Sequence, residues 1–217
     1  MSVLQDNATF VQVELQTWFE QSGRIFPWRF DHDPYHVLIA ELMLRRTQAR
    51  QVIEVYKRFI RQYPNISTLD EAANEEVETV LYPLGLKWRA KNFKAVARQI
   101  ILTHKGMVPT AQNELLALPG VGPYVTSAVL CFAFGKATVL ADTNTVRVAA
   151  RFFGFAYNAE SRRKKSVIEF IGQLVDKNKP DVSNYALLDF AALVCLPRRP
   201  LCGICPIASH CQYFLAT

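Results

Sequence analysis

The stretch LPGVGPYVTSAVLCFAFGKATVLADTNTVR, residues 118–147, decides how the rest of the chain is interpreted. It opens with a short glycine-rich hairpin, Pro119–Gly122, between two patterns typical of helices. We expect Gly120 and Gly122 to adopt backbone angles closed to other residues and to let a ligand approach the main chain closely. With a helix starting at Pro123, the N–H groups around Val121 can point at one phosphate. Such a contact would position a nucleic acid without reading its bases.

A lone carboxylate, Asp142, follows the hairpin by about twenty residues and precedes a further helical pattern. As the N-cap of that helix it would accept hydrogen bonds from backbone N–H groups, which favours its ionised form. A phosphate-binding hairpin followed at this distance by an acid indicates chemistry on a nucleic acid.

Nearly every other segment also has the pattern of a helix, so the sequence predicts an all-α fold. Asp33 and Thr110 are expected to be helix N-caps, and Pro34 is expected to be the first residue of the helix after Asp33. Gly106 is expected to close the helix that ends at about residue 104. Residues 137–141 resemble a strand but are too short and unpartnered to form a sheet. The helices are expected over about 10–21, 34–44, 49–62, 69–81, 88–104, 110–117, 123–134, 143–153, 162–176 and 184–194.

Composition excludes several classes of protein. Half of the 217 residues are hydrophobic, so the chain can bury a core and is not compositionally disordered. No apolar run of about eighteen residues exists, and the N-terminus lacks the features of a secretory signal, so we expect an intracellular protein without a membrane partner.

The net charge of +6 is compatible with a polyanion partner. Basic clusters lie at 45–46, 162–165 and 198–199, and a solvated surface is an equally good interpretation of the second one.

Four of the five cysteines lie within the last 25 residues, at Cys195, Cys202, Cys205 and Cys211, with the spacing C-x6-C-x2-C-x5-C. Paired structural disulfides are not expected in a reducing compartment. Four soft ligands inside 17 residues predict a metal site, either a four-thiolate zinc site or an iron–sulfur cluster. The spacing favours iron–sulfur because zinc sites usually pair two short knuckles across a longer gap. The fifth cysteine, Cys131, is expected to be a buried core thiol.

Taken together, these motifs resemble the helix-hairpin-helix DNA glycosylases of the endonuclease III and MutY superfamily. The resemblance covers the chain from FPWR at 26–29 to Cys211 and preserves the order of hairpin, aspartate and cysteines. It implies a [4Fe–4S] cluster held by the four cysteines. It also implies a six-helix barrel over 24–135 with the hairpin, and a second lobe formed by 1–23 and 136–217 that carries the cluster loop, 195–211. Double-stranded DNA would lie across the cleft, with the target nucleotide flipped into it.

The resemblance also implies roles for individual residues. Asp142 takes the catalytic position, where a carboxylate would stabilise the cationic sugar as the base departs. Tyr124 replaces the lysine nucleophile of the endonuclease III branch and cannot form a Schiff base, so we predict a glycosylase without AP-lyase activity. Packing at a helix start is the simpler role for this tyrosine. Glu41 matches a MutY glutamate that acts as general acid or places the water, although a surface pair with Arg45 would also explain it. The residues expected to contact DNA are Gly120, Val121, Gly122, Arg45, Arg46, Gln48 and Asn144.

Two branches of the family compete for the target base. Leu44-Arg45-Arg46-Thr47 matches the thymine–guanine mismatch branch rather than the LQQT of MutY, and paired arginines are suited to contacts with guanine or nearby phosphates. Thr143 stands where MutY has glycine, and with the sequence ending at Thr217 we expect the additional C-terminal domain of MutY to be absent. A retained glutamate at 41 fits adenine slightly better. We therefore predict removal of thymine or uracil opposite guanine, with adenine removal as the alternative.

A non-catalytic helix-hairpin-helix DNA-binding protein is the remaining alternative. It would need the hairpin and the cysteines but neither Asp142 nor Glu41. Because both acids are present, we favour an enzyme, working as a monomer.

Overall fold

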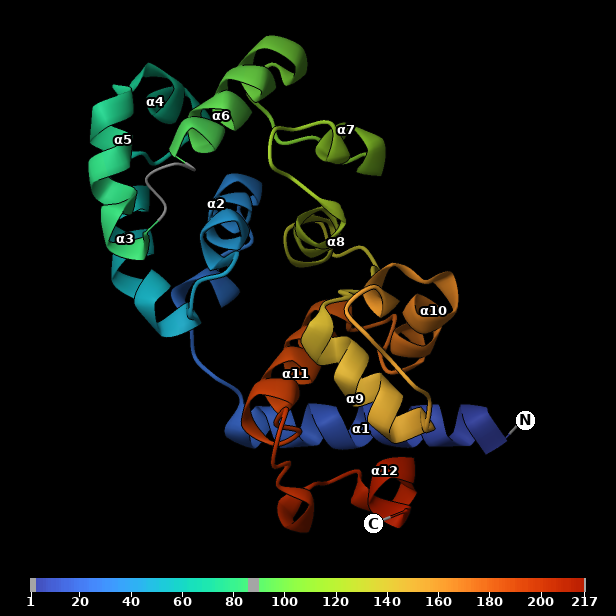
Figure 1. Cartoon of the computed structure of the whole chain (residues 1–217). Helices are drawn as coiled ribbons and strands as arrows, with labels where there is room; N and C mark the ends of the chain where they lie inside the picture. The colour runs from blue at the N-terminus through green and yellow to red at the C-terminus, as the bar shows by residue number, and fades with distance from the viewer. Residues whose placement is uncertain (1–2, 86–89, 217) are drawn as a thin grey trace. The chain divides into compact units, whose positions relative to one another are not determined.

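The computed structural model describes residues 3–85 and 90–216. Within these ranges the regular elements are helices and no strand occurs, which confirms the all-α prediction (Figure 1). Residues 137–141 carry no regular structure, as expected. The predicted start of one helix at Trp88 lies outside the described residues. In those ranges no helix is both long enough and apolar enough to cross a membrane.

The chain divides into two compact units. The inner unit comprises residues 25–134, and the terminal unit combines 1–24 with 135–217. In the inner unit α2 packs against α3 and α8, while α6 packs against α4 and α5. Phe59 and Phe93, each at most 1% exposed, meet in its core with ring centroids 5.7 Å apart. The helices of this unit are α2 (Pro34–Leu44), α3 (Ala49–Gln62), α4 (Ile66–Glu71), α5 (Asn74–Leu81), α6 (Ala90–His104), α7 (Gln112–Leu116) and α8 (Pro123–Phe132).

Helix α2 is the central helix for function because it begins at a strong signal and is buried along most of its length. The Asp33 carboxylate accepts hydrogen bonds from the N–H groups of Tyr35 (2.8 Å) and His36 (3.1 Å), and Pro34 occupies the first position, as predicted. Every residue from Val37 to Met43 is buried. Any polar side chain on this stretch is therefore held inside the unit.

In the terminal unit α1 packs along α11, and α9 contacts α10, α11 and α12 (Figure 1). Trp18 of α1 meets Phe190 of α11 edge-on, with centroids 5.7 Å apart. The fully buried Asp189 accepts hydrogen bonds from the backbone N–H of Arg24 (2.6 Å) and from its guanidinium (2.7 Å). The helices are α1 (Val3–Ser22), α9 (Thr143–Phe153), α10 (Lys165–Gln173), α11 (Pro180–Leu193) and α12 (Gln212–Leu215).

Several predicted boundaries were wrong, each for a local reason. The helix predicted over 69–81 is two helices, because Asn65 and Thr68 form a capping box that starts α4 early and Ala72–Ala73 are extended. Helix α11 begins at Pro180 rather than near 184, since proline suits a first helical position. The N-cap of α7 is Ala111 rather than Thr110. Helix α1 starts at Val3, and a 3-10 turn over Ser161–Arg163 precedes α10.

Candidate functional site

The hairpin before α8 is a tight turn with one crowded side and one open side. Gly120 has a φ of +74°, and the N–H of Val121 bonds to the carbonyl of Leu118 at 3.1 Å. A Cβ on Gly120 would lie 3.1 Å from Asn92 Nδ2, so this position needs glycine for conformation and for space. Gly122 differs from the prediction: its φ of −108° is open to any residue. A Cβ there would meet no atom within 4 Å, so glycine leaves this side free for a close approach.

The segment after α2 reaches this hairpin. Arg45 ends the helix in an extended conformation, and its Nη1 donates to the Gly120 carbonyl at 2.5 Å. Arg46 has a φ of +58°, which a non-glycine residue adopts only at some cost, and its side chain is exposed. Gln48 is the exposed N-cap residue of α3 and makes no side-chain capping bond. The structure therefore brings Arg45, itself exposed, to the hairpin. Arg46, which follows it, and Gln48, before α3, are exposed as well.

Asp142 is the N-cap of α9, as predicted, and its carboxylate is held by three donors. Oδ1 accepts from the N–H groups of Asn144 and Thr145, each at 2.8 Å, and Oδ2 accepts from Asn144 Nδ2 at 2.8 Å. The Thr145 hydroxyl accepts the N–H of Asp142 at 2.9 Å, which completes a capping box. These bonds fix the orientation of a half-buried carboxylate.

Asn144 points toward Asp142, and a buried arginine supports it from behind. Arg147, 5% exposed, donates through Nη1 to Asn144 Oδ1 at 3.0 Å. It also donates through Nη2 to the carbonyl of Ala191 (2.8 Å) and through Nε to the carbonyl of Cys195 (3.0 Å), where α11 ends. A cation at this helix end is favourable because the last carbonyls lack partners within the helix. Sequence reasoning missed Arg147; the signal was an arginine placed directly between two valines, Val146 and Val148.

Glu41 is inside the inner unit, so the alternative of a surface pair with Arg45 is wrong. Its side chain is 4% exposed, because it projects from the buried stretch of α2. Burial raises the pKa of Glu41 to about 7, with the charge of Arg29 acting in the opposite direction. Oε2 has no hydrogen-bond partner within the described residues. This carboxyl can therefore carry a proton near neutral pH.

Tyr124 is the second residue of α8 and is half-buried. Its place, two residues after Gly122, puts a phenol where a helix start meets the hairpin. Tyr124 and Glu41 belong to the inner unit, and Asp142 to the terminal unit. Cys131, further along α8, is fully buried, as predicted.

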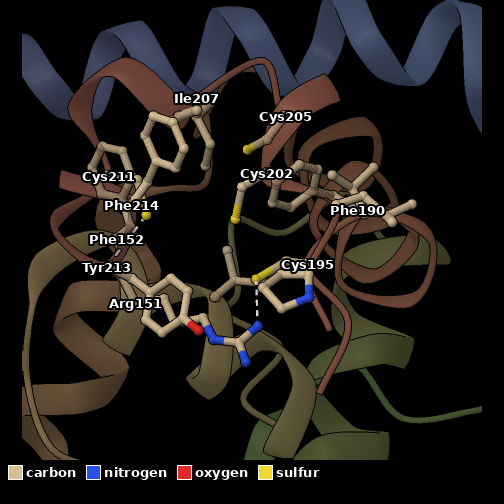
Figure 2. Close-up of a pocket in the computed structure, with 15 residues that line it drawn as sticks. Arg151, Phe152, Phe190, Cys195, Cys202, Cys205, Ile207, Cys211, Tyr213 and Phe214 are labelled. Atoms are coloured by element: carbon tan, nitrogen blue, oxygen red, sulfur yellow. Dashed lines mark hydrogen bonds between the residues drawn. The ribbon is translucent and has the colours of Figure 1, made fainter. Parts of the chain in front are cut away.

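The four C-terminal cysteines line one hollow, part of which is open to solvent (Figure 2). Cys195 follows α11, Cys202 and Cys205 flank a 3-10 turn, and Cys211 precedes α12. All four are free thiols. Burial raises the pKa of Cys205 to about 11 and also raises that of Cys211, and the neighbouring thiols add to both effects. Gathering four half-buried thiols in one place fits a bound cationic group that stabilises the thiolates.

The shape of this hollow also bears on which metal group fits. Over residues 3–85 and 90–216, no three or more His, Cys, Asp or Glu side chains are arranged to hold one metal ion. A ring of thiols around a hollow suits a cluster, in which each thiolate binds a different iron atom. Arg151 lies at its edge: Nη1 is 3.4 Å from Cys195 Sγ, and the guanidinium lies 4.9 Å from the ring centroid of Tyr213 (Figure 2).

Comparison with known families agrees with this geometry. Residues 39–173 match the family model of the HhH-GPD superfamily base excision DNA repair proteins. The chain belongs to this superfamily. Residues 195–211 match the iron–sulfur binding domain of endonuclease III, which confirms the predicted iron–sulfur cofactor and its four-cysteine segment.

Both branches weighed above are represented among the relatives of this HhH-GPD protein. It is 37% identical over 206 residues to a thymine/uracil-DNA glycosylase of Methanothermobacter thermautotrophicus, covering 94% of this chain and 93% of the relative. It is 34% identical to an adenine DNA glycosylase of Buchnera aphidicola, covering 91% of this chain but 56% of that relative. The solved structure of a thermostable thymine-DNA glycosylase superposes with a TM-score of 0.94 at 34% identity, covering all of both chains.

Proposed function

We propose that this HhH-GPD protein removes thymine or uracil opposite guanine in duplex DNA and leaves an abasic site. The observation that carries the proposal is the Asp142 carboxylate, held by three donors at the start of α9. Similarity to thymine/uracil-DNA glycosylases over nine-tenths of both chains supports the choice of base. The Arg45-Arg46-Thr47 sequence after α2 supports it further.

The reaction follows from the charge that develops on the sugar. The bond between C1′ and the base nitrogen breaks, its electron pair leaves with the pyrimidine, and the oxygen of a water molecule bonds to C1′. A fixed carboxylate at Asp142 would stabilise the cationic sugar between these two events. The departing pyrimidine is an anion delocalised over its carbonyls and takes up one proton, while the attacking water releases one, so the protons balance. The buried Glu41 carboxyl can hold such a proton near neutral pH.

The absence of AP-lyase activity is part of the proposal. Strand cleavage by β-elimination needs an amine that forms a Schiff base with the opened sugar. Tyr124 occupies the hairpin position for which the family resemblance implies that amine, and a phenol cannot perform this step. We expect the enzyme to act as a monomer on mismatched DNA inside the cell. When bound, the iron–sulfur cluster would join the segments around its four cysteines through thiolate ligands.

Adenine removal is the second candidate, and Glu41 favours it. Adenine departs readily only after protonation, and a carboxyl with a pKa of about 7 is a suitable donor. Adenine DNA glycosylases are also among the relatives. A non-catalytic DNA-binding protein is disfavoured because the similarity to glycosylases extends over nearly the whole chain.

The test is single-turnover base release from four matched duplexes carrying T·G, U·G, A·G or A·8-oxoguanine, each with and without alkali. We expect thymine and uracil release, with strand breaks appearing only after alkali. Adenine release alone would assign the second candidate, and breaks without alkali would contradict the inference from Tyr124. The Asp142→Asn variant serves as the control for contaminating activity.

A further inference from the structure

We propose that Arg45 is a positioning residue that braces the phosphate-binding hairpin, Pro119–Gly122, rather than a residue that contacts DNA directly. The inference rests on the proposed action on duplex DNA and concerns how the hairpin is held for it. Its central observation is the hydrogen bond from Arg45 Nη1 to the Gly120 carbonyl, 2.5 Å long and spanning 75 residues of sequence.

The backbone around Arg45 supports this role. Arg45 follows α2 in an extended conformation, and the backbone of the next residue, Arg46, lies in the left-handed region. Thr47 closes the turn through a bond from its N–H to the Leu44 carbonyl (3.3 Å). Arg46 adopts an unusual conformation that the surrounding turn must hold in place.

The hairpin side of the contact is equally specific. Gly120 needs its positive φ, and its Cα faces Asn92 of α6 and the Arg45 guanidinium, the latter 3.5 Å from where a Cβ would be. The open side of the hairpin is at Gly122 instead. Arg45 therefore lies against the crowded side and leaves the open side available for a phosphate.

The brace connects two parts of the inner unit. The hairpin is joined covalently to α8, whose second residue is Tyr124, and Arg45 joins it to α2, which carries Glu41 one turn earlier. A guanidinium that donates to a carbonyl forms a charge-assisted bond, which is stronger than a neutral one. Arg45 thereby keeps the hairpin N–H groups in register with the helix that carries the buried acid.

The experiment compares Arg45→Gln with wild type in three measurements. On an undamaged duplex we expect binding about tenfold weaker, the typical loss for one charge-assisted bond. The slope of log affinity against log salt concentration should stay unchanged, because no phosphate contact of a cation is lost. Amide hydrogen exchange should become faster in peptides covering the hairpin, 118–124.

Two further variants make the result specific. Arg50→Gln removes the same charge from an exposed position on α3 and should leave hairpin exchange unchanged. Arg45→Lys keeps the charge but lacks the planar fork, so it should restore binding only in part. Full recovery by lysine with hairpin exchange still fast would show that only charge matters and would overturn the brace.

Other outcomes also decide against the proposal. A salt slope reduced by about one, with unchanged hairpin exchange, would make Arg45 a direct phosphate contact. A loss confined to duplexes with guanine opposite the target would make it a base-reading residue. Unaltered binding and exchange would mean that the hydrogen bond has no role. Because binding to undamaged DNA needs no base release, these results stand even if the proposed choice of base fails.

Discussion

The starts of α8 and α9 are both helix N-termini, yet only the start of α9 has a side-chain cap. Helix α8 begins after Gly122, which makes no side-chain capping bond. Helix α9 begins after Asp142, whose carboxylate accepts two backbone N–H groups and takes part in a full capping box. The start of α8 therefore carries no side-chain anion of its own, whereas the start of α9 supplies one. One motif is suited to binding and the other to holding a reactive group still.

The two candidate catalytic acids, one in each unit, differ in the same manner. Asp142 is half-buried and has three donors, while Glu41 is buried and its Oε2 has no partner in the described part of the chain. Donors keep one carboxylate oriented, and burial keeps the other able to hold a proton. The surroundings thus give two similar carboxyl groups different chemical properties.

The largest expected effect is on chemistry at the α9 start. Asp142→Asn should reduce base release by about a thousandfold or more, because the amide cannot stabilise a cationic sugar. Asparagine is a good N-cap, so the free energy of unfolding should change by less than about 1 kcal/mol. Single-turnover assays and denaturant titration measure the two effects. Duplex binding through the hairpin should persist; its loss would mean that the two helix starts are not separate in function.

Glu41→Gln tests the second acid through pH. The unfolded chain releases this proton near pH 4.5, whereas the folded protein keeps it to about pH 7. The contribution of Glu41 to the free energy of unfolding is therefore fully present below pH 4.5 and is lost as the pH rises through 7. The neutral glutamine should stabilise the protein by roughly 3 kcal/mol at about pH 8, where the glutamate is ionised, and should have little effect at about pH 4. Denaturant titration at both values checks this, with the exposed Glu54→Gln expected to show little effect.

Arg147→Met tests the support behind the α9 start. It leaves the carbonyls of Ala191 and Cys195 and the Asn144 amide oxygen without their donor, so we expect a loss of about 2–3 kcal/mol in the free energy of unfolding. Iron content should fall as well, since the backbone at Cys195 loses an anchor. The control is Arg163→Met, which removes an exposed pair and should change stability by less than about 1 kcal/mol. Equal effects of the two variants would contradict a special role for Arg147.

Tyr124→Lys should produce the smallest effect, the gain of a partial AP-lyase activity at the α8 start. The new amine would lie two residues after Gly122 and could form a Schiff base with an abasic site. Borohydride trapping on abasic DNA detects this bond, with Tyr124→Phe as the control that adds no amine. If the lysine variant binds abasic DNA but is not trapped, residue 124 does not face the sugar.

The sequence was most informative where chemistry requires particular residues at particular spacings. The hairpin, the capping aspartate and the four cysteines were all recognisable, and the family comparisons confirm the superfamily and the iron–sulfur segment. Helix ends were less predictable, because an unnoticed capping box at Asn65 and a proline at position 180 moved them. Roles for individual residues in binding DNA stay predictions.

The sequence by itself determined the class of the fold, the family and the iron–sulfur segment, because these depend on local patterns that survive without knowing the packing. Only the tertiary structure decided the surroundings of three charged side chains. Arg45 bonds to a carbonyl 75 residues away, Arg147 supports Asn144 from a buried position, and Glu41 lies inside the inner unit instead of on a helix surface. Burial and long-range hydrogen bonds arise from packing between helices, and no spacing along the chain encodes them directly.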